Sequence, residues 1–410
     1  MEILTREQQI VLHLAGRSIS AEPSSLVLAN EYFENADWEE VERICQMQAI
    51  TLSAFDALSP YKKLIPTAVY EHWKKNAFSA LQSNYFVMQA QTELTALLQE
   101  NSFPYIILKG LSAGAYYPKT DLRSLGDVDF LIEPEKQKEI ENVLIENGYQ
   151  KSAQETDHHV VFYKQKAHLE MHFEVAGIPH GEVGELVRAC LQDALNSSIK
   201  RGENGVFYAP NDAHHGLILL LHMQHHMLGE GLGIRHLCDW ATYVNGTYEK
   251  EYWAETLLPF LKKIGLYTYA KVMTKTCAIY LQSVCPDWAC DAKEALCLEV
   301  ISDVLACGNF GRNDEERSKG GMLVSEHGKE GTKHNRAYYL CKLLHTETMG
   351  NRAVNRCKLC YPFVYVWRIC WHLTRAIFGK SKPIKVFNEA KKRKAIYDKL
   401  KVFERDTKEK

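Results

Sequence analysis

Alternating apolar and polar positions mark the most informative stretch of the chain, residues 105–134. A first apolar run ends at Lys109-Gly110. A second run, over residues 128–132, carries Asp129 within it and follows directly on Asp127. Successive side chains of a strand point to opposite faces, so this pattern predicts two strands with a Gly-bearing segment between them. Asp127 and Asp129 are therefore expected on the same face of the second strand.

A second alternating stretch lies over residues 167–175. Its polar positions, which alternate with apolar ones, are His168, Glu170, His172 and Glu174. An apolar run over residues 159–163 precedes it, and Lys164-Gln165-Lys166 lies between the two runs, which predicts a hairpin. We expect Glu170, in the middle of the second strand, to face the aspartate pair. Glu174 and Asp157 are the alternative acids.

Most of the remaining chain has the apolar spacing of three to four residues that is typical of helices. The helices are expected over residues 37–49, 71–100, 135–147, 212–228 and 235–244, over much of 249–306, and over 336–350 and the Lys-rich end. Residues 361–378 are aromatic and apolar with interspersed Arg. Residues 307–330 are rich in Gly, Asn, Ser and charge, which predicts a loop. These elements together predict an α+β fold.

Length and composition indicate the class of protein and the cellular compartment. A chain of 410 residues with 46% hydrophobic and 24% charged residues is typical of a globular protein with more than one domain. The N-terminal residues do not resemble a signal peptide, and the twelve cysteines lack the spacing of a small disulfide scaffold. We therefore expect a cytoplasmic protein with reduced thiols.

Charge is distributed unevenly along the chain. Residues 351–410 carry 17 Lys/Arg and 5 Asp/Glu, a net charge of +12, whereas the whole chain has a net charge of −2. Such a basic end predicts an anionic partner, which could be a nucleic acid, an acidic membrane surface or the acidic remainder of the same protein. The alternative is a helix packed on the body of the protein with its basic face in solvent.

The aspartate pair predicts a metal site. Two neighbouring carboxylates repel each other unless a cation lies between them, and hard oxygen ligands suit Mg²⁺ or Mn²⁺. A solvated strand edge is the alternative. His222, His225 and His226 share one helix face, where buried or nucleotide-lining histidines are favoured over a zinc site. Arg123 could stabilise phosphoryl charge or pair with Asp127, and Arg235 could simply pair with Asp239.

With these pieces the chain resembles the polymerase-β-like nucleotidyltransferase superfamily and, more closely, a bacterial family of uncharacterised nucleotidyltransferases. The resemblance covers roughly residues 70–260. The matching pieces are Leu108-Lys109-Gly110, Tyr116-Tyr117, Arg123, Gly126 to Leu131, Leu169 to His172, and His222 to Asp239 with Trp240 after it.

The resemblance implies a polymerase-β-like domain with a mixed β-sheet, flanked by N-terminal helices and a C-terminal helical domain. The expected parts are an N-terminal helical segment (1–65), a nucleotidyltransferase domain (66–209), a helical domain that closes the cleft (210–350) and a basic, aromatic-rich segment (351–410). The implied reaction transfers an NMP from an NTP, with ATP expected, to an unknown acceptor and releases pyrophosphate. A protein, a small molecule or an RNA end could be that acceptor.

The residue roles follow from the same resemblance. Catalytic and metal-binding roles are expected for Asp127, Asp129 and Glu170. Nucleotide-binding roles are expected for Lys109, Gly110, Ser112, Arg123, His222, His226 and Arg235. The chain departs from the superfamily at Gly110, which is followed by Leu111 rather than Ser or Gly. A catalytically silent nucleotide-binding or scaffold protein is therefore the main alternative, and an RNA-binding module that uses the basic tail is another.

Overall fold

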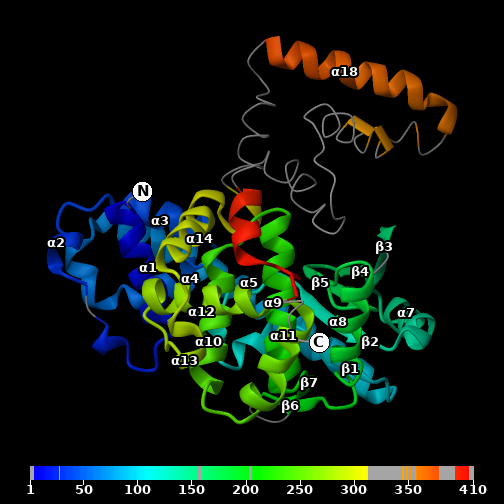
Figure 1. Ribbon diagram of the computed structural model, residues 1–410, viewed down its shortest axis with the longest axis horizontal. Helices are drawn as coiled ribbons and strands as arrows, with labels where there is room; N and C mark the ends of the chain where they lie inside the picture. Colours follow the sequence, from blue (N-terminus) through cyan, green and yellow to red (C-terminus); the bar gives the residue numbers. More distant parts are fainter. Residues whose placement is uncertain are drawn as a thin grey trace.

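The computed structural model describes residues 4–26, 28–155, 159–202 and 206–312, parts of 344–377, and residues 393–405. A mixed five-stranded sheet lies at one side of a larger helical body (Figure 1). The α+β class predicted from the sequence is confirmed at this level. None of the described helices combines the length and the apolar character needed to cross a membrane.

The five strands are ordered β1-β2-β5-β4-β3 in space. Their bounds are Tyr105–Ile107 (β1), Val128–Ile132 (β2), Gln150–Glu155 (β3), His159–Lys164 (β4) and Ala167–His172 (β5). β2 and β5 run parallel, and all other neighbours are antiparallel. The predicted β4–β5 hairpin is confirmed, with Lys164 opposite Ala167. A separate two-stranded sheet pairs β6 (Ile199–Arg201) with β7 (Phe207–Ala209).

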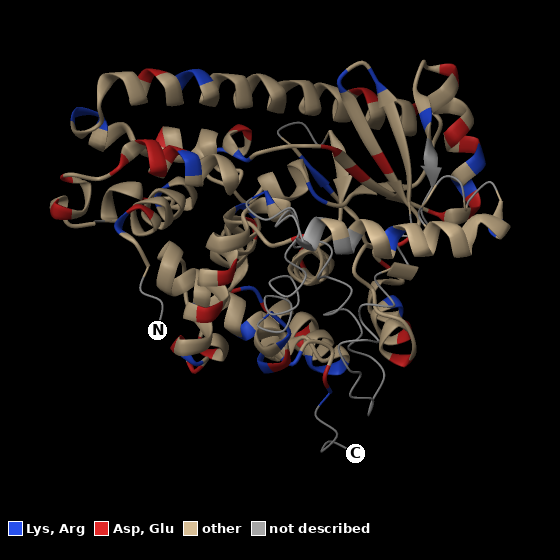
Figure 2. Cartoon of the chain, turned by 90° about the horizontal axis from the view of Figure 1, so that it is seen from above, with Lys and Arg blue, Asp and Glu red and all other residues tan. Residues whose placement is uncertain are grey.

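One face of the large sheet is buried under helices. α5 (Thr67–Glu100) crosses this face, and α7 (Gln137–Glu146) packs beside it (Figure 2). Their apolar side chains share a core with alternate residues of β2 and β5, namely Ala90, Leu94, Leu98, Ile140, Leu144, Val128, Phe130, Ile132, Leu169 and Met171. Because strand residues alternate between faces, Asp129 and Glu170 project from the opposite face, toward the helical body.

The helical body joins the two ends of the chain in one core. Its N-terminal part consists of α1 (Arg6–Ile19), η1 (Pro23–Ser25), α2 (Asn30–Phe33), α3 (Trp38–Met47), α4 (Thr51–Ala57) and η2 (Ser59–Leu64). Its later part contains α8 (Glu182–Leu191), α9 (Asp212–Leu228), α10 (Ile234–Thr247), a π-helical turn η5 (Trp253–Leu257), α11 (Leu258–Ile264), α12 (Tyr267–Leu281), α13 (Asp287–Cys290) and α14 (Glu294–Cys307). Residues from both parts belong to one hydrophobic cluster, so the N-terminal helices have no separate core.

Helix starts follow local sequence signals. Asn211 caps α9 by accepting a hydrogen bond from the His214 amide at 2.9 Å, and Asp37 caps α3 in the same way at 3.0 Å. The helix bounds predicted at 228 and 235 are confirmed within one residue, since α9 ends at Leu228 and α10 begins at Ile234. Short elements connect the sheet to the helices: α6 (Leu111–Gly114), η3 (Thr120–Leu122), η4 (Pro134–Lys136) and η6 (Asn309–Gly311).

The basic C-terminal segment has two different environments. A helix over residues 393–400 packs into the body, where Tyr397 is 3% and Leu400 0% exposed. η7 (Lys358–Cys360) and α18 (Tyr361–Ile377) carry large exposed apolar side chains instead. Of the predicted helix over 336–350 the structure describes residues 344–345 and 348–349, which are helical, and most of the predicted loop over 307–330 lies outside the described residues. The division of the chain into parts at residues 65, 209 and 350 stays a prediction.

Candidate active site

The three acids predicted to act together lie next to one another on the open face of the sheet. The parallel pairing of β2 with β5 places Asp129 directly opposite Glu170. The side-chain oxygens of Asp127 and Glu170 lie within 4.8 Å of each other and of His168, and those of Asp129 and Glu170 lie within the same distance of each other and of His172. Two neighbouring strands thus supply a compact set of oxygen and nitrogen donors.

Asp129 is held by two cationic or proton-donating groups. Lys109, at the end of β1, places Nζ 2.8 Å from Asp129 Oδ1, and His172 Nε2 lies 3.0 Å from the same oxygen. Burial by itself would raise the pKa of Asp129, but the Lys109 charge and the His172 hydrogen bond outweigh it and hold this pKa well below its usual range. The pKa of His172 is raised despite burial, because it is hydrogen-bonded to Asp129 and Glu170.

The pKa of Asp127 is shifted in the opposite direction from that of Asp129. The nearby charge of Asp129 and burial raise the pKa of Asp127, although Lys109 partly offsets them. No ion pair of Asp127 is present among the described residues. Asp127 and Glu170 therefore supply negative charge that Lys109 alone does not neutralise. This donor set fits a hard divalent cation, which prefers carboxylate oxygens and keeps room for phosphate or water.

Arg123 is committed to a buried structural pair. Its Nε and Nη2 each lie 2.7 Å from the carboxylate oxygens of Asp239 on α10, and Tyr117 Oη donates to Asp239 at 2.7 Å. Neither alternative pairing, Arg123 with Asp127 or Arg235 with Asp239, is present among the ion pairs of the described residues, where Arg123 pairs with Asp239. This contact fixes the segment before β2 against α10, so it positions Asp127 relative to the helical body.

Arg235 lines the same pocket, and its charge is in no ion pair among the described residues. Its guanidinium lies over the Phe310 ring, 5.3 Å from the centroid, and its buried Nε has no hydrogen-bond partner among the described residues. Burial and the charge of Arg123 lower the pKa of Arg235. Phe310 has a φ of 56°, which is uncommon for a residue other than glycine and places its ring against this arginine. Arg235 thus offers free donors to an anion.

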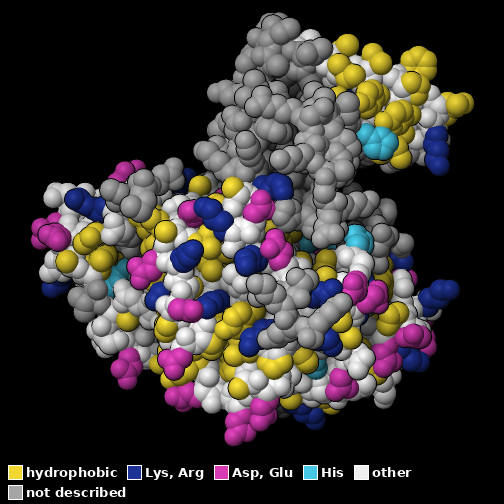
Figure 3. Space-filling model, in the orientation of Figure 1, with side chains coloured by type: hydrophobic (Ala, Val, Ile, Leu, Met, Phe, Trp, Pro, Cys, Tyr) yellow, Lys and Arg dark blue, Asp and Glu magenta, His cyan; other side chains and the backbone are white. Residues whose placement is uncertain are grey.

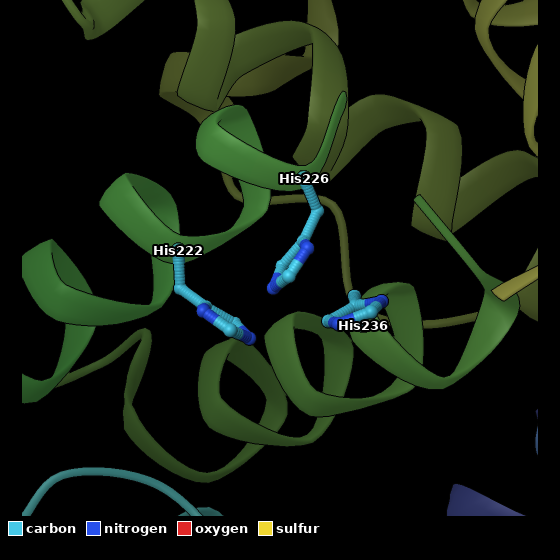
Figure 4. Close-up of side chains that lie close together, drawn as sticks. All are labelled: His222, His226 and His236. Carbon is cyan, nitrogen blue, oxygen red and sulfur yellow. The ribbon is translucent and has the colours of Figure 1, made fainter. Parts of the chain in front are cut away.

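Three histidine rings converge on one another (Figure 4), and two of them, His222 and His226, line the same pocket as the acids. His222 and His226 come from successive turns of α9, and His236 comes from α10, with ring centroids 4.3 to 5.3 Å apart. Burial and the charges of Lys109 and Arg235 lower the pKa values of His222 and His226. The predicted third member of the face, His225, is exposed and stands outside this cluster.

The tautomers of the cluster are set by its neighbours. Lys109 Nζ, which is only a donor, lies 3.5 Å from His222 Nδ1, and the Gly233 amide donates to His236 Nδ1 at 3.3 Å. Both Nδ1 atoms are then acceptors, so the proton of each neutral ring is assigned to Nε2. Protonated Nε2 atoms and two nearby cations suit phosphate oxygens better than a second metal ion.

These groups surround one pocket of about 250 Å³. Its lining consists of Lys109, Gly110, Arg123, Gly126, Asp127, Asp129, Glu170, His222, His226, Glu230, Arg235 and Phe310. Of the predicted site residues only Ser112 is absent from the lining. Its side chain is 1% exposed, and Oγ donates to the Ile107 carbonyl at 2.5 Å. Gly110 has a φ of 61°, a conformation that glycine adopts without strain.

Sequence reasoning missed four contributors to this region: Gly126, Glu230, His236 and Phe310. Glu230 lies in the turn after α9 and Phe310 in the three-residue η6, and segments this short carry no periodic signal. His236 follows Arg235 directly, which was a usable hint, but only the packing of α10 against α9 brings its ring to His222.

Comparison with known families agrees with this geometry. The family profile described as "Uncharacterised nucleotidyltransferase" matches residues 34–282, a range that contains every predicted site residue. Parallel comparisons with curated proteins and with solved structures gave no match. Because the family match covers more than half of the chain, the protein belongs to the family of uncharacterised nucleotidyltransferases.

Proposed function

We propose that the protein is a metal-dependent nucleotidyltransferase that moves an NMP from an NTP to an acceptor and releases pyrophosphate. One observation carries the proposal: a single pocket is lined both by the carboxylates of Asp127, Asp129 and Glu170 and by Lys109, Arg235 and histidines. A metal–nucleotide complex has the matching distribution of charge, with a cation bound to a polyphosphate. The family supports transfer of a nucleotide but leaves the acceptor open.

The carboxylates of Asp127, Asp129 and Glu170 would hold Mg²⁺ or Mn²⁺. Bound there, a divalent ion neutralises phosphate charge and lowers the pKa of an attacking hydroxyl. Asp129 is ionised because Lys109 and His172 stabilise its charge, so it is ready to act as a ligand. Glu170 faces both aspartates from β5, which places it to bridge them or to accept a proton from the acceptor.

The cations and histidines of the pocket would bind the phosphates. Lys109 lies between Asp129 and His222, so its ammonium can contact a phosphate oxygen without leaving the acids. Arg235 offers a planar set of donors suited to phosphate. The Nε2 proton assigned to His222 adds a neutral donor, and His236, which is 1% exposed, packs against the His222 ring. Such fixed donors stabilise charge that develops on the transferring and leaving groups.

The alternative is a catalytically silent nucleotide-binding or scaffold protein. Its supporting observation is local: Leu111 follows Gly110, and Ser112 is turned away from the pocket. A hydroxyl next to the first strand is therefore not offered to a phosphate. This alternative requires metal-dependent NTP binding without any transferred label, so one set of measurements separates the two functions.

The test is incubation of the purified protein with each of the four α-labelled NTPs, Mg²⁺ or Mn²⁺, and cell extract. We expect label on a protein, RNA or small-molecule fraction, together with released pyrophosphate. The Asp127→Asn/Asp129→Asn variant should transfer none and should lose the mutual enhancement of metal and NTP binding. Metal-dependent binding without transfer would favour the silent alternative, and binding that is equal in wild type and variant would remove the metal site.

A further inference from the structure

Helix α18 presents a continuous apolar stripe to solvent. Phe363, Val366 and Trp367 are 78%, 58% and 53% exposed, and Leu359 in the preceding turn is 83% exposed. The intervals of three and four residues place these side chains on one helical face. Figure 3 shows apolar side chains gathered at the end of the molecule where Figure 1 draws α18. A stripe of adjacent large apolar side chains marks an interaction surface more clearly than scattered ones do.

The remaining aromatic and basic side chains of the helix make contacts with one another and with His345. Tyr361 and Tyr365 stack with ring centroids 5.7 Å apart, and Tyr361 Oη is hydrogen-bonded to His345 Nδ1 at 2.5 Å. The Arg368 guanidinium lies 5.3 Å from the Trp367 centroid and 5.7 Å from that of Trp371. The outward face of α18 is therefore apolar at the positions that the structure describes. The packed basic helix expected as the alternative for the C-terminal segment stays a prediction.

Charge around the stripe has a single sign. Residues 351–385 contain eight Lys/Arg and no Asp/Glu. An apolar helix face with basic flanks and aromatic residues is typical of a helix that lies in the plane of a membrane surface. Anionic headgroups attract the flanking cations, while Trp and Tyr suit the boundary between headgroup and acyl chain. A 17-residue helix with two arginines is also too short and too charged to span the bilayer.

We propose that α18 is an in-plane anchor for an anionic lipid surface. Nucleic acid fits the stripe less well, because aliphatic Leu359 and Val366 offer nothing to phosphates and little to bases. A protein partner would bury the stripe but would give no reason for 35 consecutive residues without an acid. The lipid surface accounts for the stripe and the charge together. The proposal is independent of the nucleotidyltransferase function.

The test uses the full chain and sedimentation with vesicles of phosphatidylcholine alone or mixed with phosphatidylglycerol. We expect binding to the mixed vesicles that weakens severalfold when salt rises from about 0.1 M to about 0.5 M. The variant Phe363→Ser/Val366→Ser/Trp367→Ser should lose at least about tenfold in partitioning, which corresponds to about 1.4 kcal/mol. The matched control is Phe78→Ser/Tyr85→Ser on α5, which removes side chains that are 62% and 67% exposed and should bind like the wild type.

A second measurement reports how deeply the α18 helix inserts into the lipid bilayer. Brominated phospholipids should quench part of the tryptophan fluorescence of the wild type, and Trp367→Phe should keep vesicle binding while losing that part of the quenching. The proposal is overturned if the protein ignores phosphatidylglycerol vesicles, or if the triple variant binds them as well as the wild type. It is also overturned if sedimentation velocity shows a dimer that only the triple variant loses, since the stripe would then bind a second copy of the chain.

Discussion

The two arginines of the pocket differ in what surrounds their charge. Arg123 is neutralised by a bidentate contact with Asp239, whereas Arg235 makes no ion pair among the described residues and lies over the Phe310 ring. We predict that Arg235→Met lowers the affinity for metal–NTP by at least about tenfold and leaves thermal stability unchanged or higher, because an unpaired, half-buried cation is removed.

Arg123→Met should instead destabilise the fold by about 3–5 kcal/mol, because it leaves Asp239 buried and unpaired. Thermal unfolding with and without metal–NTP measures both. An equal loss of affinity and stability in the two variants would contradict the assignment.

The two glutamates of the strand region also differ at the residue scale. Glu170 lies beside the aspartates, but Glu174 is paired with Arg188, 2.5 Å from its Nε. We predict that Glu170→Gln loses transfer while NTP affinity stays within about tenfold, the scale of one weakened contact. Glu174→Gln is the matched control and should remain active. Labelled-NTP transfer and NTP binding are the measurements, and the reverse pattern would reassign the third acid.

At the scale of elements, α1 packs closely on α12 through Gly16. A Cβ placed on Gly16 would lie 2.5 Å from the Leu281 carbonyl oxygen, which cannot move without disturbing the end of α12. Gly16→Ala should therefore cost about 1–3 kcal/mol of stability through overpacking. Gly246→Ala on α10 is the control, because its nearest neighbour would be Tyr116 Cδ1 at 3.7 Å. That change should be neutral or stabilising by up to about 1 kcal/mol, since alanine favours a helix interior. Denaturant unfolding compares the two.

His13, which also lies in α1, makes the stability of the protein depend on pH. Burial and the charge of Arg17 lower the pKa of His13 to about 4, and its Nε2 lies 2.8 Å from Tyr61 Oη. The unfolded chain binds the His13 proton more readily than the folded protein does. The contribution of neutral His13 to the free energy of unfolding is therefore complete above about pH 6.5 and is lost as pH falls toward the folded-state pKa. Between about pH 7 and about pH 5 the free energy of unfolding should fall by about 2 kcal/mol for this reason. Urea unfolding of His13→Gln should show a correspondingly smaller pH dependence, whereas the exposed control His180→Gln should not.

At the scale of the whole molecule, the C-terminal residues complete the helical body. Leu400 is fully buried in the large core, and Tyr397 Oη is hydrogen-bonded to Gln224 Oε1 at 3.2 Å on α9. Leu400→Ala should destabilise the protein by about 2–5 kcal/mol, as expected for a large-to-small change in a core. Lys399→Ala breaks only an exposed pair with Glu299 and should cost less than about 1 kcal/mol. Thermal unfolding of the two variants tests this, and equal midpoints would show that these residues do not support the body.

Local pattern was sufficient for elements whose signals lie within a few residues. The period-two runs located β2, β4 and β5, and Asn211 marked the start of α9 because its side chain caps the next turn. The same periodicity placed Asp127, Asp129 and Glu170 on strand faces before their partners were known. Only the parallel pairing of β2 with β5, through a crossover that sequence pattern does not specify, brought Asp129 opposite Glu170.

The sequence by itself determined the acids, the basic end and the helical and strand segments, since each depends on residue type and short-range spacing. Tertiary structure alone decided that Arg123 pairs with Asp239, 116 residues away, and that His236 joins His222. It also turned Ser112 inward and left the apolar face of α18 outward. These outcomes depend on which helix packs against which sheet face. A side chain finds such a partner only when the whole chain has buried its core, so no local pattern encodes it.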